Sequence, residues 1–208
     1  MPRNALIAAQ IAAMALAILA ASPTLAEPKP ATTDPTVAHA GHYVLDHTHA
    51  SLLAKVSHLG LSFYTMRFNR FDARYDYDPS SPSASRIEVT IDANSLDVGD
   101  DAIGHQFARQ FLGADKHPQI TFVSAGVQST EPGHGLLAGD LTLNGVTRPV
   151  TLDVAFNGAG PGVFGLGGYR MGFSAVGDVK RSDFGLKAWE GLVGDTVRLL
   201  IEVEFVRK

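Results

Sequence analysis

The chain has 208 residues with a formal net charge of −4, and it contains no cysteine. The lack of cysteine excludes disulfides, thiol nucleophiles and cysteine-based zinc sites, while the mild acidity leaves no basic surface for nucleic acid. The length suits a single domain with a sizeable core. We therefore expect one domain that is stabilised by its apolar core and does not bind nucleic acid.

The first 26 residues have the features of a cleavable signal peptide. Arg3 gives a positive start, the residues from Ala5 to Ala21 form an apolar stretch, and Thr24-Leu25-Ala26 offers a small-residue cleavage site. An uncleaved membrane anchor is the alternative, but the apolar stretch is short, rich in alanine and followed by Pro23. We expect residues 1–26 to be removed and the protein to be exported.

The remaining chain begins with a segment without a period and continues with alternating strands. Residues 27–41 are rich in Pro, Thr and Ala, which predicts a flexible lead-in. Further on, Ile87, Val89 and Ile91 alternate with polar neighbours, a period of two that is typical of strands. The same alternation occurs in residues 70–77, 150–156, 169–175 and 197–205. Strands with one apolar and one polar face predict an antiparallel sheet that is wet on one side.

Two local patterns add a hairpin and a helix to these strands. Asn144-Gly145 joins two alternating runs and predicts a tight hairpin. In DDAIGHQFARQFLG, by contrast, Ile103, Phe107 and Phe111 recur at i, i+4 and i+8, acidic residues open the segment, and Gly113 can end it. This segment is predicted to be one amphipathic helix.

About eight one-sided strands and one helix fit either a sandwich or a closed antiparallel barrel. An eight-stranded barrel has room for one small ligand. The inward apolar pattern fits a filled core as well as a lined cavity, and by itself it slightly favours the filled core.

Five stretches of the chain, taken together, resemble a known family. They are YVLDHTHASLLAKVSHLGLS, VTIDANSLDVG, FLGADKHPQITFVS, GDLTLNGVTRPVTLDVAF and FSAVGDVKRSDFGL. Each resembles, in the same order, a pattern of the YceI-like family of exported lipid-binding proteins. The resemblance extends from about residue 43 to the C-terminus.

The resemblance implies an all-β fold, an antiparallel eight-stranded lipocalin-like barrel with one amphipathic helix closing an end. It implies that residues 42–208 form a YceI-like lipid-binding domain, exported to the periplasm, with an apolar tunnel for a long-chain isoprenoid of the quinone or prenyl phosphate type. The chain departs from the family at Ile103-Gly104, where an Arg-Asp pair is usual, and is one residue shorter there. Its ligand could therefore differ in head group or chain length. The glycine-rich residues 157–168 are predicted to form a mobile rim loop.

Two histidines, His47 and His49, have the H-x-H spacing found in metal sites. No second motif supplies a third ligand, and the spacing is common by accident. We expect His47 to face solvent and His49 to bond the backbone or Asp46, so no metal site is assigned.

A third histidine, His58, continues the inward series Leu52, Ala54 and Val56. An imidazole in an apolar setting needs a hydrogen-bond partner, because leaving it unpaired costs about 1–3 kcal/mol. The partner is either a neighbouring side chain or the polar head of a ligand. Arg67 and the Lys180-Arg181 pair are candidate cations for a phosphate head, although the pair equally fits a solvated turn.

The predicted ligand-binding residues are the inward side chains of the strands. They are Phe71, Tyr75, Val89, Ile91, Phe122, Leu141, Phe173, Leu199, Ile201 and Val203, together with His58. No nucleophile elbow, P-loop or dinucleotide fingerprint occurs in the sequence. We therefore expect a binding protein and not an enzyme, with a bound isoprenoid or similar apolar lipid and no cofactor.

Two rival functions stay open at this point. One is a metal-dependent enzyme or metal-binding protein that uses His47, His49 and His58. The other is a stress-associated protein whose barrel is filled and whose outer surface binds a partner. Transient membrane contact and a homodimer are further alternatives that the sequence leaves open.

Overall fold

The computed structural model describes residues 31–163 and 165–208. The predicted signal peptide and residues 27–30 lie outside this range. The ten strands of the described part are β1 (Gly41–His58), β2 (Ser62–Phe68), β3 (Phe71–Tyr77), β4 (Arg86–Asp92), β5 (Leu96–Asp97), β6 (Gln119–Glu131), β7 (His134–Leu143), β8 (Val146–Pro161), β9 (Tyr169–Lys180) and β10 (Val193–Arg207). The α-helix is α2 (Asp101–Leu112), and 3-10 turns span Pro35–Val37, Pro82–Ala84, Ala93–Ser95 and Arg181–Phe184. Within the described residues, no helix has the length and hydropathy that crossing a bilayer requires.

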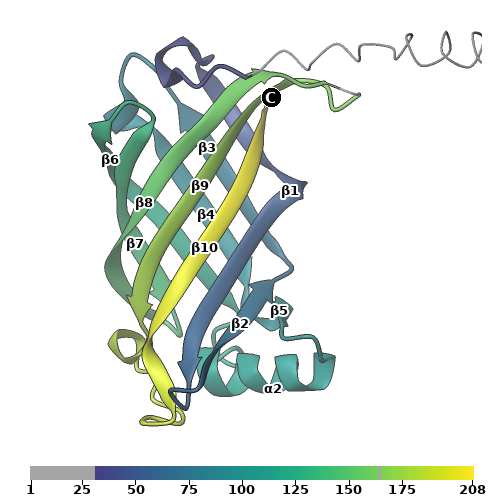
Figure 1. The fold of residues 1–208 in the computed structure, drawn as a ribbon, viewed down its shortest axis with the longest axis vertical. Helices are drawn as coiled ribbons and strands as arrows, with labels where there is room; N and C mark the ends of the chain where they lie inside the picture. The colour runs from purple at the N-terminus through teal and green to yellow at the C-terminus, as the bar shows by residue number, and fades with distance from the viewer. Residues whose placement is uncertain (1–30, 164) are drawn as a thin grey trace, which may run out of the picture. The chain divides into compact units, whose positions relative to one another are not determined.

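Eight of these strands form a closed antiparallel barrel (Figure 1). Around the barrel the order is β1, β10, β9, β8, β7, β6, β4 and β3, and β3 pairs with β1 again to close the ring. β2 pairs with the last residues of β1, and the short β5 pairs with β2. The predicted eight-stranded antiparallel barrel is therefore confirmed, and the sandwich alternative is wrong.

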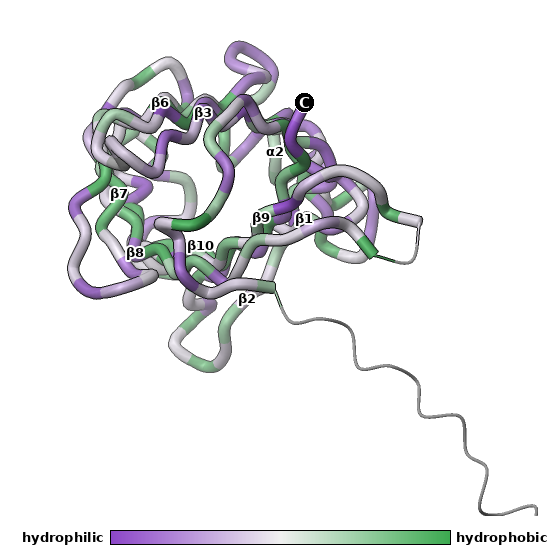
Figure 2. The backbone as a smooth tube through the Cα atoms, turned by 90° about the horizontal axis from the view of Figure 1, so that it is seen from above, coloured by the Kyte–Doolittle hydropathy of each residue, from purple (hydrophilic) through white to green (hydrophobic). Residues whose placement is uncertain are grey.

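The barrel has two different ends (Figure 1). We call "helix end" the one that carries α2, the β1–β2 turn and residues 181–193. The "opposite end" carries residues 31–40 and the β8–β9 turn. The view along the barrel places its strands in a ring around a common axis (Figure 2).

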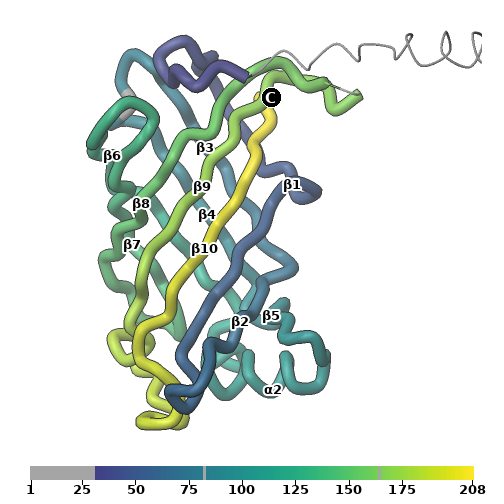
Figure 3. Tube along the Cα trace, viewed as in Figure 1, coloured from purple at the N-terminus to yellow at the C-terminus, as the bar shows by residue number. Residues whose placement is uncertain are grey.

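The first strand is interrupted by a bulge that lets it pair with two different neighbours. Its pairing with β10 moves from Leu45↔Phe205 directly to Ala50↔Val203, so residues 46–49 stand opposite Glu204 alone. Before the bulge β1 pairs with β3, and after it with β2. A bulge bends a strand and increases its twist, and here the chain kinks outward (Figure 3). The sequence DHTH at 46–49 is thus the point where β1 changes partners.

The predicted helix is confirmed as α2. The Asp100 carboxylate accepts a hydrogen bond from the Ile103 backbone N–H at 3.0 Å, and Gly113 ends the helix with φ 67°. A Cβ on Gly104 would lie 2.5 Å from the carbonyl oxygen of Leu96. The glycine at this departure from the family pattern therefore lets α2 lie directly against the start of β5.

The apolar core has two parts along the barrel axis. The cluster toward the helix end is built mainly from aliphatic side chains, including Leu52, Ile91, Ile120 and Leu141. The cluster toward the opposite end includes six aromatic rings in successive contact, with centroid separations of 5.5–6.4 Å. We call these rings the aromatic plug: Tyr43, Tyr75, Tyr77, Phe156, Phe173 and Phe205.

Part of the predicted flexible lead-in contacts the aromatic plug. The Tyr43 and Tyr77 hydroxyls each donate a 2.6 Å hydrogen bond to a backbone carbonyl, of His39 and Pro35 respectively. The His39 ring stacks on Tyr169 at 3.9 Å. Burial raises the pKa of Tyr43 to about 12. Residues 31–40 therefore lie across the opposite end of the barrel.

The glycine-rich segment predicted as a rim loop lies at the same end. Its first residues, up to Pro161, continue β8 and pair with β9. Val163 and Gly165–Gly168 then make the turn into β9.

Candidate functional site

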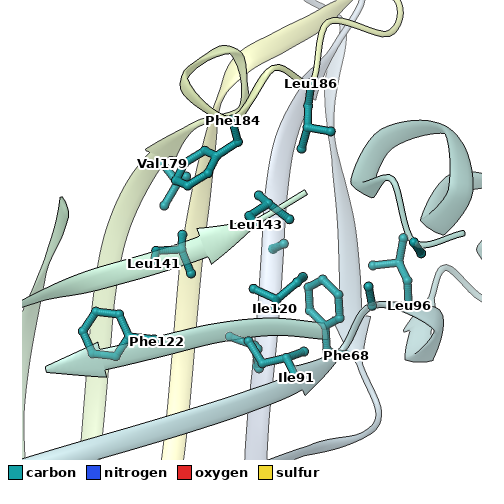
Figure 4. Packing of buried hydrophobic residues seen from close by; sticks show 14 of the residues in the cluster. Phe68, Ile91, Leu96, Ile120, Phe122, Leu141, Leu143, Val179, Phe184 and Leu186 are labelled. Carbon is teal, nitrogen blue, oxygen red and sulfur yellow. The ribbon is translucent and has the colours of Figure 1, made fainter. Parts of the chain in front are cut away.

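The helix-end half of the barrel encloses an apolar cavity of about 180 Å³. Side chains from β1, β2, β4, β6, β7, β9 and β10 line it, and α2 and the segment 181–193 complete the lining at its end. Figure 4 shows part of this lining, including Ile91 of β4, Ile120 of β6 and Leu141 of β7. Trp189 belongs to the lining and is half exposed, so the cavity opens at the helix end. The lining residues are Leu52, Ala54, Val56, His58, Tyr64, Met66, Phe68, Ile91, Leu96, Phe107, Phe111, Leu112, Ile120, Leu141, Leu143, Val179, Arg181, Leu186, Trp189, Val193, Val197 and Leu199.

The predicted binding residues fall into three groups in the structure. His58, Ile91, Leu141 and Leu199 line the cavity. Those that pack within or against the surrounding aliphatic cluster, outside the cavity lining, are Phe71, Val89, Phe122 and Ile201, of which Phe71 and Val89 also pack against the cluster that contains the aromatic plug. Those in or against the aromatic plug are Tyr75, Phe173 and Val203. A period of two identifies the inward face of a strand, but it does not say at which depth each residue lies. Ligand contact stays a prediction for all three groups.

Several cavity residues come from outside the barrel wall and are not among the predicted binding residues. Phe107 and Phe111 of α2 pack edge to face at 5.1 Å, and Phe111 also contacts Trp189 at 5.7 Å. The i, i+4 spacing of the two phenylalanines signals the apolar face of the helix. Trp189 lies in an irregular segment, where no periodicity points inward.

His58 lies at the opening of the cavity, where β1 ends. Its backbone pairs with Ser62 and Val193, and its ring meets Tyr64 in an edge contact at 6.3 Å. The His58 side chain is half-buried and belongs to the cavity lining. The ring therefore presents a donor and an acceptor at the boundary between the apolar cavity and solvent.

Arg181 is buried and shapes the segment that covers the cavity. Its guanidinium donates to four backbone carbonyls, those of Gly194, Leu186, Ala188 and Val193, at 2.6–3.0 Å. An arginine has five N–H donors, so four of them are committed within the protein. Arg181 therefore holds residues 186–194 in place and has little left to offer a phosphate head.

The two other candidate cations lie outside the cavity lining. Lys180 is exposed. Arg67 donates to the Ala50 carbonyl at 3.3 Å.

The β1 bulge holds a polar network around Asp46. Its carboxylate accepts hydrogen bonds from the Thr48 backbone and hydroxyl at 2.9 and 2.6 Å, from His49 Nδ1 at 2.8 Å, and from Arg170. Although desolvation by itself would raise the pKa of Asp46, these hydrogen bonds hold it well below its usual range. Arg170 also donates to Glu204 at 2.9 Å. The predicted bond between His49 and Asp46 is confirmed.

The same network bears on the metal hypothesis. Asp46, His49 and Glu204 each offer a ligand atom, and these atoms lie within 4.8 Å of one another. However, Arg170 bridges the two carboxylates, so a guanidinium already neutralises the charge that a cation would need. His47 points elsewhere, toward Asp72 at 3.8 Å. The H-x-H pair therefore does not converge on one point.

Comparison with known proteins places this barrel among relatives of similar length. A UPF0312 protein of Ectopseudomonas mendocina (strain ymp) is 37% identical over 174 residues, which cover 82% of this chain and 90% of the relative. The UPF0312 protein YE1254 of Yersinia enterocolitica is 38% identical over 160 residues, covering 76% of this chain and 82% of the relative.

Solved structures show the same architecture, and sequence similarity extends over nearly the whole barrel. Burkholderia cenocepacia BcnA superposes with a TM-score of 0.67 at 25% identity, covering 77% of this chain and 98% of BcnA. A polyisoprenoid binding domain from Saccharophagus degradans superposes with a TM-score of 0.58 at 15% identity, covering 82% of this chain and all of that domain, a likeness of fold alone. The family model of the YceI-like domain matches residues 43–205. The chain belongs to the YceI-like family.

Proposed function

We propose that this protein is an exported carrier that holds a long-chain isoprenoid lipid in the cavity at its helix end. The observation that carries the proposal is the cavity itself, which is lined almost entirely by hydrocarbon and aromatic side chains and opens beside His58. A hydrocarbon ligand needs shape and apolar lining more than directed bonds. Membership of the YceI-like family, and the fold shared with a polyisoprenoid binding domain, support the same ligand class.

The size of the cavity limits how a long chain can enter. At about 180 Å³ it is smaller than the ~300–1,000 Å³ of usual ligand pockets. A long isoprenoid therefore requires side chains to move, either at the α2 cover or at the aromatic plug. The cover is the better candidate, because Trp189 is already half exposed whereas Tyr43 and Phe205 are fully buried.

The polar groups near the opening favour a neutral head group. A phosphate head brings a strong negative charge, and burying it requires a cation with free donors. Arg181, the cation in the lining, donates to four backbone carbonyls. His58 can donate one hydrogen bond to an acceptor such as a quinone carbonyl. Within the proposed ligand class, this arrangement supports a quinone over a prenyl phosphate.

Binding of this kind favours transport over storage. Each CH₂ group that leaves water gains about 0.8 kcal/mol, but a bilayer solvates the same chain equally well. The net preference for the protein is then small, and loading and unloading are both accessible. The signal-peptide features of residues 1–26 support export to the periplasm as the setting.

Mass spectrometry of the protein purified from its native compartment tests the proposal. The native mass is compared with the mass after organic extraction, and metal content is measured on the same sample. We expect one apolar lipid per protein, lost on extraction. A bare protein without metal that stays bare after incubation with quinones and prenyl phosphates would overturn the proposal and leave the filled barrel. Stoichiometric metal that disappears in His49→Ala would instead support the metal-binding alternative.

A further inference from the structure

The helix end of the barrel carries a group of exposed apolar side chains. Three lie on the β1–β2 hairpin and two on the segment that covers the cavity, and each is between 47% and 84% exposed. We call this group the apolar rim: Leu59, Leu61, Phe63, Trp189 and Leu192. Single exposed apolar residues are normal on a protein surface, whereas a contiguous group indicates an interaction site.

The two segments of the apolar rim form one surface around the cavity opening. The Leu59 backbone N–H donates to the Leu192 carbonyl at 2.8 Å, which ties the hairpin tip to the covering segment. Trp189 packs on Phe111 of α2 at 5.7 Å and also lines the cavity. The apolar rim is therefore continuous with the cavity lining, and a molecule that crosses the opening passes over it.

Backbone strain sets the same two turns apart. Leu59 has φ 55° and Trp189 has φ 56°, a left-handed conformation that is unfavourable for large side chains. Among the described residues only Asn144 shares this non-glycine conformation, and asparagine tolerates it. Strained residues are held in place by the surrounding structure and concentrate at functional sites. Here both strained residues belong to the apolar rim, and each side chain is about half exposed.

The chemistry of the rim and of the ligand fits a bilayer. A long isoprenoid has negligible solubility in water, so its exchange requires contact between the cavity opening and the membrane that dissolves it. Tryptophan prefers the interface between membrane and water. Residues 55–63 and 186–193 carry Lys55, Lys187 and Glu190, a balance of +1 on a chain whose net charge is −4. Lys55 lies over the Phe63 ring at 4.8 Å, which places a cation beside an apolar anchor.

We propose that the apolar rim is a membrane-docking surface through which the ligand passes between the bilayer and the cavity. The docking role rests on the proposed function, since it supplies the route by which an insoluble lipid reaches the site. The docked protein lies with its helix end on the bilayer and its aromatic plug toward solvent.

Vesicle co-sedimentation tests the docking role directly. The full protein is mixed with vesicles of phosphatidylcholine and phosphatidylglycerol, and the wild type is compared with the rim variant Leu61→Ser/Phe63→Ser/Leu192→Ser. The matched control is Val37→Ser/Val163→Ser/Leu166→Ser, which removes three exposed apolar residues at the opposite end. We expect at least a tenfold loss of vesicle binding in the rim variant and wild-type binding in the control. Equal binding by all three proteins, or none by the wild type, would overturn the docking role.

A second measurement separates docking from ligand binding. Each protein is loaded with ubiquinone from detergent micelles, and transfer to quinone-free vesicles is then followed. We expect the rim variant to load as much quinone as the wild type, because none of its three substituted residues lines the cavity, and to transfer it at least tenfold more slowly. Equal loading with equal transfer rates would overturn the docking role and leave the carrier function intact. Vesicle binding by a wild type that loads no quinone would overturn the carrier function, and with it the passage of a ligand through the apolar rim, while membrane contact itself would stand.

Circular dichroism and thermal melting confirm that the variants are folded. Gel filtration over a range of concentrations addresses a second copy of the chain as the occupant of the rim. A wild-type dimer that becomes a monomer in the rim variant, with unchanged vesicle binding, would overturn the membrane assignment.

Discussion

The two ends of the barrel are built by the same strands and differ in what fills them. Toward the opposite end β1 contributes Tyr43 and β10 contributes Phe205, and these rings pack within the aromatic plug. Toward the helix end the same two strands contribute Ala54 and Leu199, which leave a cavity. The alternation of inward and outward residues is the same at both ends. Whether this barrel is solid or hollow is therefore set by side-chain volume at each level along its axis.

The largest effect is expected from a charged side chain in the cavity at the helix end. Ile91→Asp places a carboxylate in the cavity lining, where an unpaired charge is highly unfavourable, and we expect ligand retention to be abolished. Thr90→Asp, on the outer face of the same strand, is the control and should retain the lipid. Mass spectrometry of the purified variants measures the bound lipid. A folded Ile91→Asp protein that keeps its lipid would place the ligand elsewhere.

Large-to-small substitutions compare the packing of the two ends. Phe205→Ala removes a fully buried ring from the aromatic plug and should lower the free energy of unfolding by about 3–5 kcal/mol. Leu199→Ala enlarges an existing cavity and should have a smaller effect, about 2 kcal/mol. Chemical denaturation of both ligand-free variants tests this difference. Equal losses would mean that the helix end is packed as tightly as the plug.

The bulge between the two ends gives a prediction about pH. Asp46→Asn weakens the bond to Arg170 and should lower the free energy of unfolding by about 1–3 kcal/mol at pH 7. The folded protein holds the pKa of Asp46 below the unfolded value of about 3.9. The contribution of the carboxylate is therefore present above pH ~4 and is lost as the pH falls through the folded pKa. Denaturation at pH 7, 5 and 3 measures the free energy of unfolding of both proteins. The difference between wild type and variant should be the same at pH 7 and 5 and smaller at pH 3. A difference that widens in acid would contradict this role of Asp46.

A smaller effect tests the close fit of the helix that covers the cavity. Replacing a helical glycine with alanine normally stabilises by about 0.5–1 kcal/mol. In Gly104→Ala the new methyl would lie 2.5 Å from the Leu96 carbonyl oxygen, so α2 has to shift. We expect a net loss of about 1 kcal/mol, measured by thermal melting. Ala102 is exposed, so the control Ala102→Gly measures helix propensity alone. If Gly104→Ala stabilised the protein, α2 would have room to shift away from Leu96.

Much of the fold could be predicted from the sequence, and the site only in part. Period-two strands, the i, i+4 phenylalanines and Asn144-Gly145 depend on local chemistry, and the structure confirms what they predict. The depth of each inward residue depends on register and tilt, which arise only when the barrel closes. Tyr75 and Leu141 therefore look alike in the sequence, although one lies in the aromatic plug and the other lines the cavity.

Residues outside the strands were the hardest to assign. Arg181 reads as a surface cation, because nothing local predicts the four carbonyls that surround it. Trp189 lies in a turn without a period, so its place at the opening depends on long-range packing against α2. On a continuous strand His47 and His49 would share one face. The bulge instead turns the two rings toward different carboxylates.

The position of Trp189 also allows membrane and ligand binding to be followed by intrinsic fluorescence. It is the one tryptophan of the chain, it lines the cavity, and about half of it faces solvent. Its emission should move to shorter wavelength when the helix end leaves water for a lipid headgroup layer. A quinone that enters the cavity beside it should quench that emission instead. Membrane binding and quinone binding can therefore be distinguished by fluorescence of the unlabelled protein. Trp189→Phe should remove both the wavelength shift and the quenching.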